Sequence, residues 1–153
     1  MNKEDSRKLI LNMVNFYTLF NVEFMDLIPD LSNSEISPLL SKIINYIHLE
    51  GTTTSSNLSK KLNISVPNIS RSINTLYSLG YIIKTQDKKD RRIIYLSLSN
   101  KALDLIATVI SKSEKIFLER FKVLTTDEIH DMYESFYKIQ NLLIKMRELN
   151  SKK

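Results

Sequence analysis

The fold is decided by residues 65–92, which read SVPNISRSINTLYSLGYIIKTQDKKDRR. Ser65 suits a helix N-cap, Pro67 is tolerated in a first turn without intrahelical donors, and Gly80 suits the left-handed position that ends a helix. Between these signals apolar residues recur at steps of three and four, which predicts a buried stripe. Its members are Val66, Ile69, Ile73, Leu76 and Leu79. The stretch therefore predicts a short amphipathic helix followed by a basic hairpin.

The opposite face of this helix is polar and contains no acid. Its members are Pro67, Asn68, Arg71, Asn74, Thr75 and Ser78, with Ser70 and Ser72 on the flanks. Arg71 lies almost opposite the apolar stripe. Small polar side chains around one Arg suit entry into a major groove and hydrogen bonds to base edges and phosphates. An ordinary solvated helix face has the same pattern, so the helix alone leaves both interpretations open.

The distribution of charge favours DNA. No Asp or Glu occurs from Gly51 to Gln86, although the chain has 17 acids in 153 residues. The net charge from Gly51 to Arg92 is +6, whereas that of the whole chain is +5. The positive charge is therefore concentrated in one segment, as expected of a surface that displaces counterions from phosphates.

Composition limits the remaining possibilities. The chain has only two glycines and three prolines, which favours long helices with short connections. It has no cysteine, which excludes disulfides, cysteine-ligated zinc and thiol sensing. No long apolar run and no signal-peptide pattern is present, so we expect a soluble, cytoplasmic protein with no membrane partner. There is neither a Gly-rich phosphate loop nor a Gly-flanked Ser nucleophile, so we expect no enzyme, no catalytic residue and no cofactor.

Other helices are expected on both sides of the central stretch. A first helix is predicted from about residue 6 to 27. Ser32 and Glu35 have the spacing of a capping box, which predicts a helix from there to Glu50, with Gly51 as its stop. Thr54 is expected to cap a short helix that runs through residue 62. Together with the helix after residue 65, this makes a helix-turn-helix.

The C-terminal part is expected to begin with strands over residues 81–86 and 91–98, joined by a basic turn. Ser99 suits the N-cap of a helix over residues 100–122, and Thr125 with Glu128 predicts a capping box for a last helix. That last helix has a 3.5-residue apolar repeat, typical of helices that wrap around partners. We therefore expect a homodimer, since the first and last helices have more apolar surface than one subunit usually covers. The alternatives for the first helix are that it packs on the last helix or covers a core within one subunit.

Three segments carry a resemblance to a known family: NLSKKLNIS (57–65), ISRSINTLYSLGYI (69–82) and DKKDRRIIYLSLS (87–99). They resemble the winged helix-turn-helix of the multiple-antibiotic-resistance regulator (MarR) family of bacterial transcription factors. The resemblance implies a mainly α protein with a small β-hairpin wing, organised as a single unit over residues 1–153. Its DNA-binding lobe would be residues 32–98, and its dimerisation helices would be residues 6–28 and 100–149.

The resemblance also implies which residues contact double-stranded DNA at a palindromic operator. Ser70 and Arg71 occupy the positions of the Thr/Ser-Arg pair in the family's recognition helix. Asp90, Arg91 and Arg92 occupy the positions of the Asp-Arg-Arg sequence in its wing. Arg91 is the expected minor-groove residue, with the acid and the other Arg bracing the hairpin. Thr75 and Ala102 depart from the family pattern, which often has a basic residue and Gly there. The full expected set is Thr54, Ser55, Pro67, Asn68, Ser70, Arg71, Asn74, Thr75, Ser78, Lys84, Lys88, Lys89, Asp90, Arg91 and Arg92.

Control by a ligand follows from the resemblance alone, which implies a repressor released by a small lipophilic or phenolic effector. Tyr17, Phe20, Tyr46 and His48 could line such a site, and helix-core packing explains them equally well. His48 and His130 share no ligand spacing, so no metal site is expected. The alternative to a regulator is a winged helix that serves as a protein-interaction or DNA-packaging module without an effector site.

Overall fold

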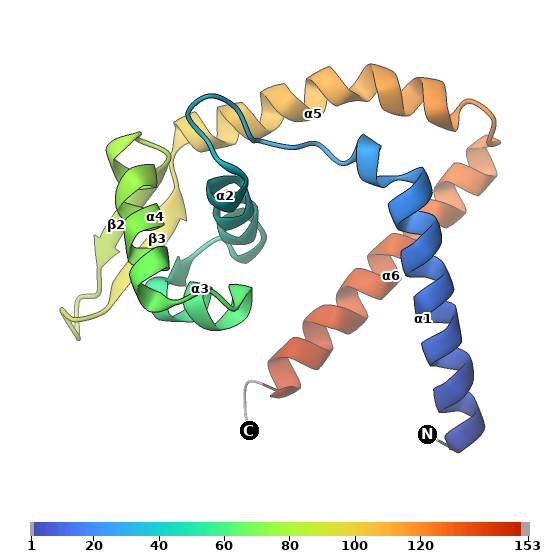
Figure 1. Ribbon diagram of the computed structural model, residues 1–153, viewed down its shortest axis with the longest axis horizontal. Coiled ribbons are helices and arrows are strands. Elements are labelled where there is room, and N and C mark those ends of the chain that lie inside the picture. Colours follow the sequence, from blue (N-terminus) through green and yellow to red (C-terminus); the bar gives the residue numbers. More distant parts are fainter. Residues whose placement is uncertain (1, 151–153) are drawn as a thin grey trace. The chain divides into compact units, whose positions relative to one another are not determined.

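The computed structural model describes residues 2–150 and divides into two compact units, Met1–Ser113 and Glu114–Lys153. The structure is mainly helical with one small antiparallel sheet, as expected (Figure 1). The elements of the first unit are α1 (Lys3–Glu23), the 3-10 helix η1 (Met25–Leu27), α2 (Pro38–Glu50), β1 (Thr53–Thr54), α3 (Ser55–Leu62), α4 (Val66–Ser78), β2 (Ile82–Gln86), β3 (Ile94–Leu98) and the first part of α5 (Asn100–Phe121). The second unit contains the end of α5 and α6 (Thr126–Asn150).

Several predicted helix ends are confirmed. Gly51 follows α2 with φ +70°, and Gly80 follows α4 with φ +77°, a conformation that L side chains rarely adopt. The Thr54 hydroxyl accepts the Asn57 N–H at 3.3 Å and caps α3. Thr125 and Glu128 form the reciprocal pair of a capping box, in which each backbone N–H reaches the other residue's side chain.

The predicted capping box at Ser32 and Glu35 is wrong. Helix α2 begins at Pro38, with Ser37 as its N-cap and the Ser37 hydroxyl accepting the Leu40 N–H. Because a residue that precedes proline is driven out of the α region, Ser37 is extended at ψ 163° and no helix can pass through it. Residues 33–35 form a bend instead, and Asn33 Oδ1 accepts the N–H groups of Glu35 and Ile36 there.

Four further features differ from expectation. The first helix begins at Lys3 and ends at Glu23, with η1 after it. Strand β1 was not predicted, because it has two residues and forms only by pairing with β3 far along the chain. Val66 is exposed, since it is the first residue of α4 and lies beyond the edge of the core. Arg91 and Arg92 lie in the wing turn, so β3 starts three residues later than expected.

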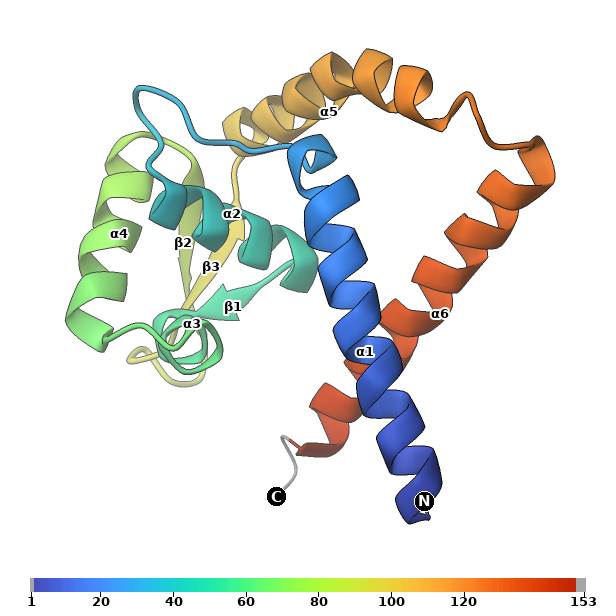
Figure 2. The ribbon, with the colours of Figure 1, turned by 45° about the vertical axis from the view of Figure 1, so that its right-hand side comes forward.

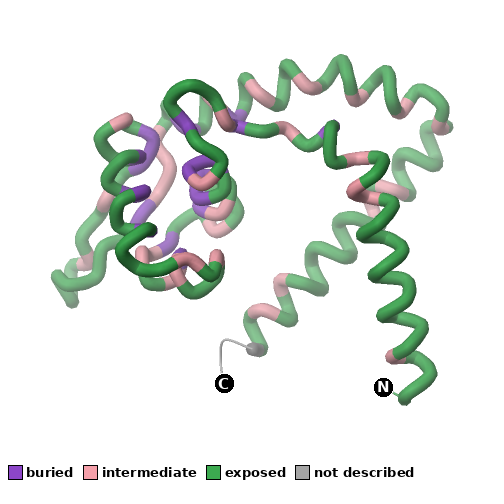
Figure 3. Tube along the Cα trace, viewed as in Figure 1, coloured by how far each residue is buried: buried purple, intermediate pink, exposed green. Residues whose placement is uncertain are grey.

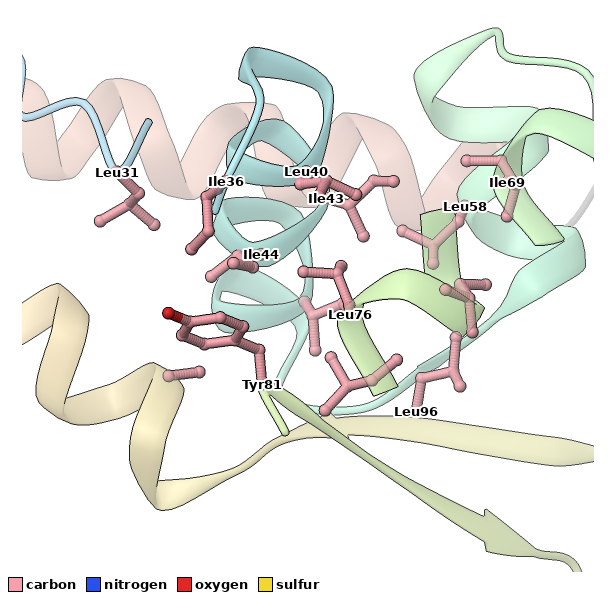
Figure 4. Packing of buried hydrophobic residues seen from close by; sticks show 14 of the residues in the cluster. Leu31, Ile36, Leu40, Ile43, Ile44, Leu58, Ile69, Leu76, Tyr81 and Leu96 are labelled. Atoms are coloured by element: carbon pink, nitrogen blue, oxygen red, sulfur yellow. The ribbon is translucent and has the colours of Figure 1, made fainter. Parts of the chain in front are cut away.

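The core of the first unit lies between α2, α3, α4, the sheet and the start of α5. Ile44, Leu58, Ile69, Leu76 and Leu96 are fully buried there and come from α2, α3, α4 and β3 (Figure 4). Burial is concentrated in this region, while α1 and α6 are exposed along most of their length (Figure 3). The polar face of α4 is therefore presented by a helix whose other face is anchored in the core.

The sheet has the order β1-β3-β2, with both pairs antiparallel (Figure 2). Thr53 pairs with Leu96 and Ile82 pairs with Leu98, so β3 is the central strand. This pairing connects the entrance of α3 to the wing. The position of the wing is thus fixed relative to the helix-turn-helix.

Candidate nucleic-acid interface

The polar face of α4 is exposed and internally hydrogen-bonded. Arg71 Nη2 donates to Asn68 Oδ1 at 3.1 Å, which holds the guanidinium along the helix surface. The Thr75 hydroxyl donates to the Arg71 carbonyl at 3.1 Å, and the Ser78 hydroxyl donates to the Thr75 carbonyl at 2.9 Å. These hydroxyls therefore keep only their lone pairs for an outside partner. Pro67 and Ser70 are exposed on the same helix, whereas Ser72 is buried.

Lys84 connects the wing to α4. Its ammonium, which extends from β2, donates to Asn74 Oδ1 at 2.8 Å and lies 4.7 Å from the centroid of the Tyr77 ring. Asn74 and Tyr77 are one helical turn apart, so one lysine spans both. Sequence reasoning placed Lys84 and Asn74 in the interface separately and missed Tyr77, because the pairing of a strand residue with a helix residue has no local sequence signal.

The wing tip is organised by Asp87. Its carboxylate accepts the N–H groups of Lys89 and Asp90, both at 2.8 Å. These bonds, the Asp90 N–H first, hold the pKa of the Asp87 carboxyl below its usual value. Asp90 in turn accepts the Arg92 N–H at 3.0 Å. The bracing role expected of Asp90 is thus shared with Asp87, which sequence reasoning treated only as turn chemistry.

The charged side chains of the tip are all accessible. Lys88, Lys89, Arg91 and Arg92 are exposed, and Gln86 Nε2 donates to the Arg91 carbonyl at 2.7 Å. The last bond holds the backbone carbonyl of Arg91 and does not involve its side chain. Carboxylate and amide groups already hold the backbone of the tip. The four cations can therefore contact phosphates without the entropy cost of ordering the loop.

The start of α3 lies beside the base of the wing. An open cavity of about 400 Å³ separates them, and it is lined by Thr54, Ser55, Ser56, Arg92, Ile93 and Ile94. Thr54 uses its hydroxyl as the α3 cap, while Ser55 is half-buried in the first helical turn. The structure thus brings the two expected DNA-binding residues at the start of α3 next to the expected Arg92 of the wing.

The expected effector residues are dispersed over two helices. Tyr17 and Phe20 are on α1, and Tyr46 and His48 are on α2. Tyr17 and His48 are exposed, and Phe20 and Tyr46 are half-buried. None of these four residues lines the cavity at the base of the wing. Within residues 2–150, no group of three or more His, Asp or Glu side chains is placed to hold a metal ion.

Comparison with known proteins identifies the domain. Residues 36–94 match the family model of the MarR family. The transcriptional regulator Tm0710 from Thermotoga maritima has a TM-score of 0.62 at 21% identity, covering 92% of this chain and 96% of that one. A MarR family protein from Bacillus stearothermophilus has a TM-score of 0.62 at 17% identity, covering 94% of this chain and 99% of its own.

A third solved structure contains DNA. A mutant MarR from E. coli complexed with operator DNA has a TM-score of 0.51 at 20% identity, covering 85% of this chain and 94% of its own. No curated protein sequence matches this chain. Among the described helices, none combines the length and apolar character needed to cross a membrane. The resemblance indicated by the sequence motifs is confirmed: residues 36–94 match the MarR family model, and solved transcriptional regulators share the fold of this chain.

Proposed function

We propose that this protein is a transcriptional regulator that binds an inverted-repeat operator as a homodimer. The observation that carries the proposal is the exposed, acid-free face of α4, with Arg71 at its centre and a basic wing beside it. The polar side chains of α4 would contact base edges in the major groove. The wing cations would contact phosphates, and Arg91 would enter the adjacent minor groove.

The electrostatics of this surface support the assignment. Lys60 and Lys61 lie in the last turn of α3, and the remaining cations of the basic segment lie on α4, β2 and the wing tip. From residue 51 to residue 86 no acidic side chain opposes them. Exposed cations in such an arrangement attract a polyanion at distances up to about a Debye length, roughly 8 Å at physiological salt.

The proposal of a dimer rests on the apolar surface of α1 and α6. No residue of α1 is buried, although Leu9, Ile10 and Val14 are among its exposed apolar side chains. On α6, Leu142 is 61% exposed and Leu143 is 59% exposed. Exposed apolar surface on each of these helices favours an interaction site, and a second copy of the chain would cover it symmetrically. Two recognition helices would then lie roughly 34–36 Å apart, one turn of DNA.

Repression relieved by a small lipophilic or phenolic effector is the proposed mode of control, acting in the cytoplasm. It is supported by the MarR-family domain and by aromatic side chains on α1 and α2, namely Tyr17, Phe20 and Tyr46, with His48 close to Tyr46 in sequence. A ligand bound there would shift the spacing of the two α4 helices if it bound one arrangement of the dimer better than another.

Gel-shift titration with the gene's own upstream DNA and with random duplex DNA, at two salt concentrations, tests the proposal. We expect one preferred inverted repeat, protected on one face of the duplex, and release by a phenolic compound in a ligand screen. Equal affinity for all duplexes would indicate a DNA-packaging protein, and no affinity at all would indicate a protein-interaction module. Sedimentation of a monomer at micromolar concentration would contradict the dimer.

A further inference from the structure

Lys84 controls which hydrogen-bonding groups α4 can offer to a base. The ammonium of Lys84 has three donors and no acceptor, so its 2.8 Å contact with Asn74 requires the carbonyl oxygen of the amide and not its nitrogen. The orientation of the Asn74 amide is therefore fixed by the chemistry of its partner. The nearby Tyr77 ring holds the same ammonium from a second side, at 4.7 Å.

The same restriction applies earlier on α4. The Asn68 carbonyl oxygen accepts from Arg71 at 3.1 Å, and guanidinium nitrogens can only donate. Both asparagines of the exposed face therefore direct one carbonyl lone pair to a cation of the protein and keep the second. The amide nitrogen of exposed Asn74 makes no hydrogen bond to another residue within the described range 2–150. The groups of Asn68, Arg71 and Asn74 that are left for DNA are then mainly donors.

We infer that Lys84 is a positioning residue. By orienting the Asn74 amide, it makes the centre of the α4 face bind base edges that are rich in hydrogen-bond acceptors. An asparagine with a free amide recognises adenine by donating to N7 and accepting from N6. Lys84 takes one of the two lone pairs of the Asn74 oxygen and turns that oxygen toward β2, which leaves the amide NH2 group as the part of Asn74 that is free to face the base. Guanine presents two adjacent acceptors, N7 and O6, in the major groove, whereas adenine presents the acceptor N7 beside the N6 donor. The operator should therefore favour a G·C pair over an A·T pair opposite Asn74. The inference rests on the proposed DNA-binding function.

Lys84→Met tests it, because methionine keeps the aliphatic stem of the lysine and removes the donor that fixes the amide. Lys88→Met is the matched control, since it removes one exposed cation from the wing tip and leaves the Asn74 contact intact. Asn74→Asp is a second variant. It keeps an acceptor for Lys84 and removes the donors that would face the base. Thermal unfolding curves of the three variants establish that each is folded.

The readout is the set of sequences that each variant enriches from a randomised duplex library. The base pair opposite Asn74 is defined as the one whose sequence preference disappears in Asn74→Ala. The wild type should enrich a G·C pair there. Lys84→Met should gain A·T pairs, with about a tenfold change in the ratio of G·C to A·T. Asn74→Asp should lose the guanine preference. Lys88→Met should weaken all binding and keep the wild-type profile.

Failure of the inference is distinguishable from failure of the proposed function. An A·T preference of the wild type at that position would overturn the inference, and so would identical profiles for Lys84→Met and Lys88→Met. In both cases the wild type would still select a consensus, and the proposed regulator would stand. A wild type that enriched no sequence would overturn the proposed function, and the inference with it.

Discussion

Replacement of Arg71 by alanine should separate sequence recognition from general affinity. Arg71 is exposed and its guanidinium donates to Asn68 on the same helix, so the substitution should change the free energy of unfolding by less than about 0.5 kcal/mol. On the operator, removal of a base contact should weaken binding by about 1–3 kcal/mol per subunit. In a dimer the substitution acts at both half-sites, which amounts to roughly 2–6 kcal/mol, at about 1.4 kcal/mol per tenfold. Random DNA should be affected much less.

The comparison variant is the double replacement of Lys88 and Lys89 by alanine. Both side chains are exposed at the wing tip, where they can reach phosphates in many rotamers. Their removal should weaken operator and random DNA alike and reduce the slope of log K against log salt by about 0.9 for each phosphate that is no longer neutralised. Arg91→Ala should lie between the two, because a minor-groove Arg senses groove width as well as charge.

The assay is the ratio of operator affinity to random-DNA affinity, measured by fluorescence anisotropy at two salt concentrations. Arg71→Ala should lower this ratio, and the lysine variant should leave it nearly constant. If the ratio were unchanged in Arg71→Ala and collapsed in the lysine variant, α4 would be a support for the wing and not the recognition helix. Circular dichroism of each variant checks that the fold is kept.

Four further outcomes are expected. Phe136→Asp places a charge on the exposed apolar face of α6 and should dissociate the dimer; a dimer in sedimentation velocity would contradict this. Leu76→Ala should destabilise the fold by about 2–5 kcal/mol in urea unfolding, because Leu76 is fully buried. The pKa of Asp87 is lower in the folded protein than in the unfolded chain, where it is about 3.9. The contribution of Asp87 to wing order is therefore present above the unfolded pKa and is lost as the pH falls through the lower folded pKa. The amide NMR signals of Lys89 and Asp90 should shift in that window and should not shift above about pH 5. Peroxide too dilute to oxidise the five methionines should leave DNA binding unchanged, since the chain has no thiol; abolished binding would refute this.

Local signals in the sequence were sufficient for most of the fold. Helix ends depend on residues within one turn, so the sequence predicted them at the correct positions. These are the stops at Gly51 and Gly80 and the caps at Thr54 and Thr125. The error at Ser32 shows the limit of such patterns. A capping-box spacing is common by chance, and the stronger signal was Pro38, whose ring excludes the preceding residue from a helix.

The candidate site was less accessible from sequence because its key contacts join distant segments. The charge pattern and the α4 periodicity identified Arg71 and the wing cations, which are exposed as expected. The Lys84 contact with Asn74 depends on how β2 packs against α4, and the pairing of β1 with β3 depends on the closed sheet. Neither has a short-range pattern, so only the tertiary structure shows them.

The end of α4 is bound to the start of α5 by several hydrogen bonds, and this limits how a change elsewhere in the protein can reach the polar face of α4. The Ser99 hydroxyl donates to the Gly80 carbonyl at 2.6 Å, and Lys101 Nζ donates to the Leu79 carbonyl at 2.9 Å. These carbonyls follow the last turn of α4, where a helix has acceptors without internal partners and favours a cation. Lys101 also lies 4.2 Å from the centroid of the Tyr81 ring. These contacts supply donors from the start of α5 to the carbonyl groups at the end of α4. The end of α4 and the start of α5 must therefore move together or break several hydrogen bonds at once. A ligand that reoriented the first turn of α5 would therefore reorient α4 as a rigid helix, without unfolding the winged lobe.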